Sequence, residues 1–283
     1  MPYTNLLPIA DVTCAVVKAP STVPKTRRLT LRIGQGGQIL EIQDPTGRRL
    51  TPEAKRPHTR PGAEGADDCC QVVETASNTA ENVHQGGSYA TRQGGPYNGP
   101  NLPRCLHFEA GTTWWSARVR PYMSRNGVRP GPFIFETSGG ILPNGEVTIE
   151  TVITGVDGAK VSRLAAPIVV FRRMLRYVSI DNGDTWLDGR KYLWGRSELR
   201  QTRGTRLLVA EQPNPKRALR FESLGGDGPV ERLRYGTMAG NAGIERDGVI
   251  AAFADNVTPE QSSYAVVWGI AYGALSWITE ISE

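Results

Sequence analysis

Eight turn-forming dipeptides divide this chain into short segments and constrain its fold more than any other feature. Each is Asn-Gly or Asp-Gly, the pairs that tolerate the positive φ angles of a tight hairpin turn. They begin at residues 98, 126, 144, 157, 182, 188, 227 and 247. Seven of the eight follow residue 120, so the second half of the chain is punctuated at the intervals of consecutive β-hairpins.

The segments between these turns alternate apolar and polar residues, as half-buried strands do. Residues 146–151 place Val147 and Ile149 on one face, and residues 28–33 and 115–120 follow the same pattern. Convincing helical periodicity is nearly absent. We therefore predict an all-β protein, with an antiparallel β-sandwich or jelly-roll-like core, a long ordered loop and an extended N-terminal arm.

The chain divides unevenly into three predicted parts. Residues 1–43 contain the arm and a first β-hairpin, and residues 105–283 form the β-rich core domain. Between them, residues 44–104 form a long interaction loop with fifteen Gly or Pro residues and one clear β-like patch at 71–74. Loops of this length are uncommon inside a compact domain and are usually functional or disordered.

Composition excludes a membrane-spanning protein and indicates the cytosol. The mean hydropathy is −0.35, and no run of about 20 apolar residues occurs. The first residues lack the basic start and apolar core of a signal peptide. Four cysteines without such a signal do not make a disulfide framework.

The positive charge of the chain is scattered. The net charge is +5, and 27 of the 33 basic residues are arginine. This bias indicates either arginines paired at interfaces or simply the base composition of the gene. A nucleic-acid footprint would be a dense basic stripe with interleaved aromatic residues, so we expect no nucleic-acid partner.

One octapeptide, residues 179–186, combines a turn with groups that can stabilise it. Asn182 and Gly183 suit a type I′ turn, and Asp181 can accept hydrogen bonds from backbone N–H groups of that turn. Thr185 can bond Asp181 from the far side, and Trp186 can fold back onto the sheet. These residue types build a hairpin and perform no chemistry.

The octapeptide resembles the Asp-box, S-x-D-x-G-x-T-W, of sialidases and other β-rich proteins. The residues that match are Ser179, Asp181, Gly183, Thr185 and Trp186. Membership of the sialidase family would imply a six-bladed propeller with several such boxes and an arginine triad that grips the substrate carboxylate. Here the box occurs once, so the resemblance covers a hairpin and implies no catalytic residues.

The sequence shows no catalytic motif and predicts no cofactor. Only three histidines occur, and neither a Gly-x-Ser-x-Gly elbow nor a His-Glu-x-x-His helix is present. Soft ligands gather at Cys69, Cys70, His84, Cys105 and His107. Adjacent cysteines fit zinc poorly, since structural sites space their paired ligands by two to four residues. Ordinary loop residues and small buried hydrophobes are the alternative.

Six tryptophans are the candidates for ligand stacking, although burial in a core is the commoner fate of this residue. Trp114 and Trp115 are adjacent, and neighbouring strand residues face opposite ways. One of the two must therefore leave the core side. We predict that Trp114 is the surface residue, where it could stack on a carbohydrate.

Several residues are candidates for contacts between subunits. The basic segment 48–56, with Arg48, Arg49, Lys55 and Arg56, is expected to pair with carboxylates of a neighbour. The apolar run 264–272, with Trp268 and Tyr272, needs cover on both faces. It is either a central sandwich strand or a strand that completes a sheet at an interface.

The short strands, abundant Gly and Pro, long loop and lack of a catalytic motif resemble virion structural proteins of tailed bacteriophages. This resemblance implies a non-enzymatic tail, baseplate, connector or decoration protein. Such a protein is made in the host cytoplasm and located in the virion. Its partners would be copies of itself and other virion proteins. The alternative is a glycan-binding or glycan-cleaving β protein that uses the Asp-box fold and exposed tryptophans.

Overall fold

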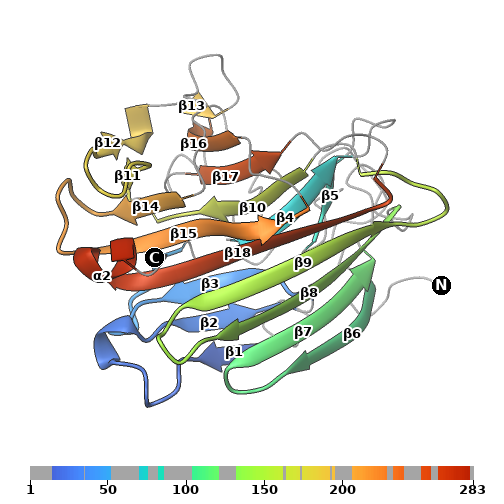
Figure 1. Cartoon of the computed structure of the whole chain (residues 1–283), viewed down its shortest axis with the longest axis horizontal. Helices are drawn as coiled ribbons and strands as arrows, with labels where there is room; N and C mark the ends of the chain where they lie inside the picture. Colours follow the sequence, from blue (N-terminus) through green and yellow to red (C-terminus); the bar gives the residue numbers. More distant parts are fainter. Residues whose placement is uncertain are drawn as a thin grey trace, which may run out of the picture.

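A computed structural model of the chain shows two nine-stranded sheets that lie face to face (Figure 1). It describes residues 15–34, 36–51, 70–75, 82–85, 104–120, 132–161, 164–172, 174–191, 193–194, 206–227, 232–238, 250–255 and 261–280. Nearly all strand pairs are antiparallel; β13 and β16 form a parallel pair. The prediction of an all-β protein with an antiparallel sandwich is confirmed.

The first sheet has the strand order β1-β2-β3-β4-β10-β17-β16-β13, with β5 paired to β4. Its strands are β1 (Ala15–Lys18), β2 (Thr30–Ile33), β3 (Ile39–Gln43), β4 (Cys70–Thr75), β5 (Asn82–His84), β10 (Leu164–Val170), β13 (Leu193–Trp194), β16 (Arg232–Met238) and β17 (Ile250–Asp255). This sheet joins strands from all three of the parts predicted from the sequence. β4 contains the β-like patch at 71–74, whereas β5 gave no clear signal.

The second sheet has the strand order β12-β11-β14-β15-β18-β9-β8-β7-β6. Its strands are β6 (Arg104–Ala110), β7 (Trp114–Arg120), β8 (Phe133–Ile141), β9 (Val147–Gly155), β11 (Tyr177–Ser179), β12 (Leu187–Asp188), β14 (Arg206–Ala210), β15 (Arg217–Gly226) and β18 (Ser263–Ala274). In the part of the chain that the structure describes, three short helices accompany the sheets: η2 (Lys25–Arg27), η4 (Gly189–Lys191) and α2 (Leu275–Glu280). Helix α2 follows directly from the end of β18 (Figure 1).

The main hydrophobic core lies between the two sheets. Leu31 and Ile33 of β2 belong to the same buried cluster as Phe221 of β15 and Trp268 and Ile270 of β18. Because strand side chains alternate, the intervening residues of β15 and β18 point away from the first sheet. We call this second surface the outer face.

Polar groups also join the sheets inside the core. The indole Nε1 of Trp115 donates to the carbonyl of Gly37 at 3.2 Å. The amide of Gln85 donates to the Thr137 hydroxyl at 2.5 Å, and that hydroxyl lies 3.0 Å from the hydroxyl of Thr151. These bonds satisfy buried polar groups that would otherwise destabilise the fold.

Two of the hairpin turns predicted from the dipeptides have the backbone angles that Asn-Gly and Asp-Gly favour. The φ angles are 55° and 79° at Asp157 and Gly158, and 56° and 97° at Asn182 and Gly183. Parts of the predicted arm and loop, residues 1–14, 52–69, 76–81 and 86–103, lie outside the described residues. Lys55 and Arg56 are among them.

Two adjacent glycines of β8 provide a test of the packing of the inner face. A Cβ added at Gly139 would overlap the buried ring of Trp115, whereas one added at Gly140 would meet Thr113 O only at 3.4 Å. We expect Gly139→Ala to lower the free energy of unfolding by about 1–3 kcal/mol through overpacking. Gly140→Ala should leave it within about 0.5 kcal/mol of wild type. Urea unfolding measures both, and equal values for the two variants would contradict the packing described here.

Candidate functional site

The outer face of the second sheet divides into two halves. Over β14 and the adjoining parts of β15 and β18 it is covered by α2, whose Ile278 is buried against Leu208, Ala218 and Ala271. Over β6, β7, β8 and β9 it carries mostly polar side chains, several of them exposed. We call these the covered half and the open half.

The Asp-box hairpin borders the covered half. Asp181 Oδ1 accepts hydrogen bonds from the Ser179 hydroxyl at 2.7 Å and from the Thr185 backbone N–H at 2.9 Å. The Ser179 hydroxyl in turn accepts from the N–H of Gly183 at 2.8 Å. The half-buried Trp186 donates through Nε1 to the Gly183 carbonyl at 2.9 Å and packs against the cluster beneath α2. All five residues that match the motif therefore hold one turn.

These hydrogen bonds also set the charge state of the turn. Partial burial acts to raise the pKa of Asp181, but the bonds from Ser179 and Thr185 outweigh it and hold the pKa below the ordinary value of 3.8. Ionised Asp181 therefore stabilises the fold above pH 3.8, and this stabilisation is lost as the pH falls through the lower pKa of the folded state.

Removing the carboxylate tests this role. We expect Asp181→Ala to lower the free energy of unfolding by about 1 kcal/mol at neutral pH, because two hydrogen bonds to a charged acceptor are lost. The difference from wild type should shrink as the pH falls toward 3. Asp184→Ala, which removes an exposed carboxylate of the same turn, serves as the control in urea unfolding at both pH values. A difference that does not depend on pH would show that the ionised form of Asp181 does not carry the effect.

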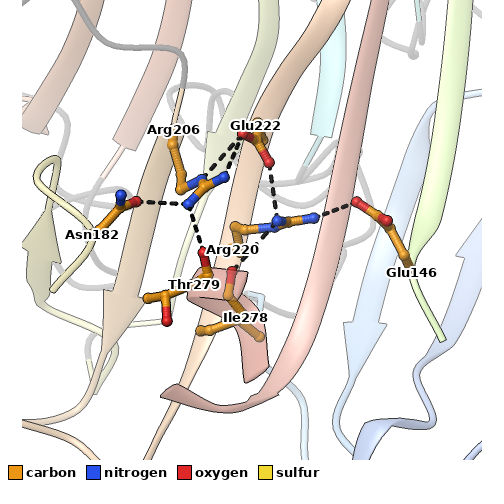
Figure 2. A network of polar contacts seen from close by, with 7 residues as sticks. All are labelled: Glu146, Asn182, Arg206, Arg220, Glu222, Ile278 and Thr279. Carbon is orange, nitrogen blue, oxygen red and sulfur yellow. Dashed lines mark hydrogen bonds and ion pairs between the residues drawn. The ribbon is translucent and has the colours of Figure 1, made fainter. Parts of the chain in front are cut away.

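A network of charged groups lies beneath α2 (Figure 2). Arg220 of β15 is 0% exposed and pairs with Glu146 on one side and with Glu222 at 3.0 Å on the other. Arg206 of β14 pairs with the same Glu222 at 2.9 Å. Figure 2 shows Glu146 approaching Arg220 from the side opposite to Arg206.

The two arginines also bind α2 and the Asp-box hairpin. Arg220 donates to the carbonyl of Ile278 at 3.4 Å, and Arg206 donates to the carbonyl of Thr279 at 3.2 Å. Arg206 further donates to Asn182 Oδ1 at 2.7 Å. The network therefore fixes the last turn of α2 and the Asp-box turn to the sheet, and positive charge near a helix C-terminus is favourable.

The chemistry of this network is structural. Burial lowers the pKa of Arg220, while Glu222 and Glu146 act to raise it. Both carboxylates are paired with guanidinium groups. A general base, in contrast, must be able to reach the substrate proton that it takes up. We infer that the covered half is closed and that a ligand site belongs elsewhere on the outer face.

Breaking this network should destabilise the protein strongly. We expect Arg220→Met to lower the free energy of unfolding by about 3–5 kcal/mol, because Glu146 would lose the ion pair that offsets its burial and Glu222 would lose one of its two arginine partners. Arg118→Met is the matched control, since it removes an exposed pair with Glu136 and should cost less than about 1 kcal/mol. Equal losses in urea unfolding would contradict the structural role of the network.

The side chains of the open half lie in rows that run across the strands, because strand register aligns them. The first row crosses Trp114, Gly140 and Thr148 and continues to Gly269 of β18. The second row is Glu109, Ser116, Ser138 and Glu150. The third row contains His107, Arg118 and Glu136.

Trp114 is a large aromatic side chain on this face, and 46% of its surface is exposed. It stands beside the turn between β6 and β7, and its indole lies against Gly111, where a Cβ would overlap the ring. Its neighbour Trp115 is 1% exposed and lies in the core. The predicted division of this pair agrees with the structure.

The second and third rows supply groups that bind hydroxyls. Ser116 and Ser138 can donate and accept hydrogen bonds, and Glu109 and Glu150 are acceptors when ionised. His107 Nε2 lies 3.7 Å from Glu109 Oε1, and both side chains are about half exposed or more. An aromatic platform next to hydroxyls, carboxylates and an imidazole is an arrangement that can hold a sugar and exchange protons with it.

Of the five candidate metal ligands, the structure describes the side chain of His107. Cys69 and the side chains of Cys70, His84 and Cys105 lie outside what the structure describes. Within the part of the chain that it describes, no group of three or more His, Cys, Asp or Glu side chains could hold a metal ion. No helix in that part is long and apolar enough to cross a membrane.

The described interface candidates make contacts within this chain. Arg48 pairs with Asp44 at 3.0 Å and with Glu211, and Arg49 pairs with Glu41 at 3.1 Å. Trp268 and Tyr272 are 4% and 7% exposed and belong to the core between the sheets. Burial raises the pKa of Tyr272, and Asp44 adds to this effect. A role for any of them between subunits stays a prediction.

Sequence reasoning missed most of these sites. Arg206, Arg220 and Glu222 were not singled out, because alternation places them on the outer face but does not reveal that α2 covers them. The hydroxyl and carboxylate row was also missed, although the alternation of residues 115–120 indicates a polar face on β7. Strand register, which brings Glu109 and Glu150 into one row, has no signal in a single sequence.

The sequence matches no family model and no curated protein, whereas the fold resembles solved structures. One is a protein of Escherichia coli K12 described as a candidate aldose 1-epimerase, with a TM-score of 0.55 and 10% identity over 93% of this chain and 100% of the other. An aldose epimerase homologue from C. elegans aligns with a TM-score of 0.48 and 11% identity over 92% and 98% of the two chains. Heparan sulfate lyase HepC of Pedobacter heparinus aligns with a TM-score of 0.49 and 10% identity over 95% of this chain and 37% of the lyase.

These comparisons correct the functional expectation. The similarity to the E. coli protein, a candidate aldose 1-epimerase, spans 93% of the chain. The predictions of a non-enzymatic virion component and of a tail or phage structural role are therefore wrong. The alternative of a glycan-binding or glycan-cleaving protein fits better. The comparisons do not bear on the Asp-box.

Proposed function

We propose that this protein is a carbohydrate-active protein that binds a sugar on the open half of the outer face. The observation that carries the proposal is the exposed Trp114, which stands beside a row of hydroxyls and carboxylates. A sugar ring presents C–H groups on its faces and hydroxyls at its edge. Trp114 offers the apolar platform, and Ser116 and Ser138 offer hydrogen bonds at a neighbouring row.

The reaction class that suits this arrangement is interconversion at the anomeric carbon. Ring opening needs a base that takes the anomeric hydroxyl proton and an acid that protonates the ring oxygen as the C1–O bond breaks. His107 and Glu109 are our candidates for these roles, because their Nε2 and Oε1 atoms lie 3.7 Å apart and can reach the two oxygens of one anomeric centre. Similarity of fold to a candidate aldose 1-epimerase supports this reaction class over glycan cleavage.

Removing the platform tests the binding proposal. Trp114→Ala should weaken sugar binding by about thirtyfold or more, since buried aromatic anchors dominate binding energies. Trp114→Phe should retain part of the affinity. Val16→Ala, which trims an exposed apolar side chain on the other sheet, is the control and should bind as wild type does. A glycan array first selects the ligand, and calorimetric titration then measures its affinity for each variant. Equal affinity of Trp114→Ala and wild type would place the sugar site elsewhere.

Catalysis is tested separately by the rate at which α-glucose and α-galactose equilibrate with their β anomers, followed by NMR. We expect His107→Asn and Glu109→Gln each to lower this rate by about a hundredfold, with binding retained. Val16→Ala, on the other sheet, is the control. If wild type equilibrates neither sugar faster than buffer does, the protein binds carbohydrate without this chemistry.

A further inference from the structure

Two exposed apolar side chains stand at opposite ends of the first row. Trp114 begins it on β7. On β15 the register partner of Gly269 is Glu222, but the side chain of Leu224, two residues further on, lies over Gly269 and has 42% of its surface exposed. A Cβ added at Gly269 would lie 3.0 Å from Leu224 Cδ1, so Leu224 rests over the bare backbone of Gly269. Four strand spacings of about 4.8 Å separate β7 from β15, roughly 19 Å in all. This length exceeds a single sugar ring.

The side chains between these two ends are small. Gly140 and Gly269 have none beyond Cα, and Thr148 stands between them in the register. Gly140 is not required by packing, because a Cβ there would make only ordinary contacts of 3.4 Å and 3.7 Å with Thr113 and Trp114. Gly269 is buried beneath Leu224 and Glu146, whereas Gly140 and Thr148 are half-buried. Only small, partly exposed residues therefore lie between Trp114 and the Leu224 side chain, parallel to the hydroxyls and carboxylates of the second row.

The charge of the open half selects the kind of ligand. Its described side chains include Arg118 and Arg120 against Glu109, Glu136 and Glu150, and Arg118 is paired with Glu136 at 3.0 Å. Among the described side chains of this face, three carboxylates therefore stand against two guanidinium groups, although the whole chain has a net charge of +5. A sulfated or carboxylated glycan would be repelled by the carboxylates of Glu109 and Glu150, whereas neutral hydroxyls can donate hydrogen bonds to them.

We propose that the ligand is a neutral oligosaccharide that lies across the strands along the first row, from the open half to the exposed Leu224 of β15. One sugar unit packs on Trp114, a later unit contacts Leu224, and hydroxyls between them bond to Ser138 and Glu150. This inference rests on the proposed function, because it requires that a sugar binds at Trp114. It adds the substrate class, which is an extended, uncharged oligosaccharide and not a single aldose or an acidic polysaccharide.

The test compares chain lengths and charges in calorimetric titrations. The probes are malto-, cello- and galacto-oligosaccharides from the monosaccharide to the hexasaccharide, with a heparin hexasaccharide as the acidic probe. We expect affinity for one neutral series to rise with length, and the heparin probe to bind more weakly than the neutral hexasaccharide of that series.

Variants at the two ends of the row separate this inference from the proposed function. Leu224→Ala should weaken binding of the neutral hexasaccharide by about fivefold and leave the monosaccharide unchanged, because only the longer ligand reaches β15. Trp114→Ala should weaken both, and Val16→Ala neither. Thermal melting checks that the variants are folded.

The outcomes are distinct. An affinity that does not change with length, or a Leu224→Ala variant that binds the hexasaccharide as wild type does, overturns the extended site but leaves sugar binding at Trp114 intact. Tighter binding of the heparin probe overturns the choice of a neutral ligand. If no probe binds wild type, the proposed function fails together with this inference.

Discussion

The opposite orientation of successive side chains in a strand is the constraint on which the rest of this structure depends. Trp115 and Trp114 show both consequences in adjacent residues: one is 1% exposed in the core, and the other is 46% exposed on the outer face. The inner residues fix the register by packing against the first sheet. That register then aligns outer residues from distant parts of the chain into rows, so the core determines where the polar groups of the open half lie.

The outer face is not uniform, because α2 and the Asp-box hairpin cover part of it. Closing this half places Arg220 out of contact with water, which is costly for a charged group. Glu146 and Glu222 offset that cost, and Arg206 joins the same cluster to the hairpin through Asn182. The covered half is therefore a structural unit, and the strands from β6 to β9 keep the exposed side chains on which the functional proposal depends.

The sequence predicted what depends on local patterns. Alternation and turn dipeptides were sufficient for the β-sandwich class, for the positive φ angles at Asn182 and Gly183, and for the surface position of Trp114. It could not predict what depends on pairing between distant segments. The pairing of β4 with β10 and the burial of Arg220 beneath α2 both arise from tertiary packing, which a single sequence does not encode in any local pattern.

The functional expectation failed for a related reason. Abundant Gly and Pro and a missing catalytic motif describe the style of a chain, not the chemistry of a site. The site proposed here comes from three or more strands, and its members, such as Glu109 and Glu150, are unremarkable where they stand in the sequence. Only their alignment beside Trp114 makes them candidates for binding a sugar.

The central claim is that a neutral sugar stacks on Trp114, and the NMR signals of the six tryptophan indole N–H groups test it most directly. The Trp114 signal, assigned by its loss in Trp114→Phe, should shift progressively as the array-selected neutral oligosaccharide is added. The signal of the core residue Trp115 should stay nearly unchanged. A sugar that binds but shifts only the signals of Trp186 or Trp277, beside the covered half, would contradict the account.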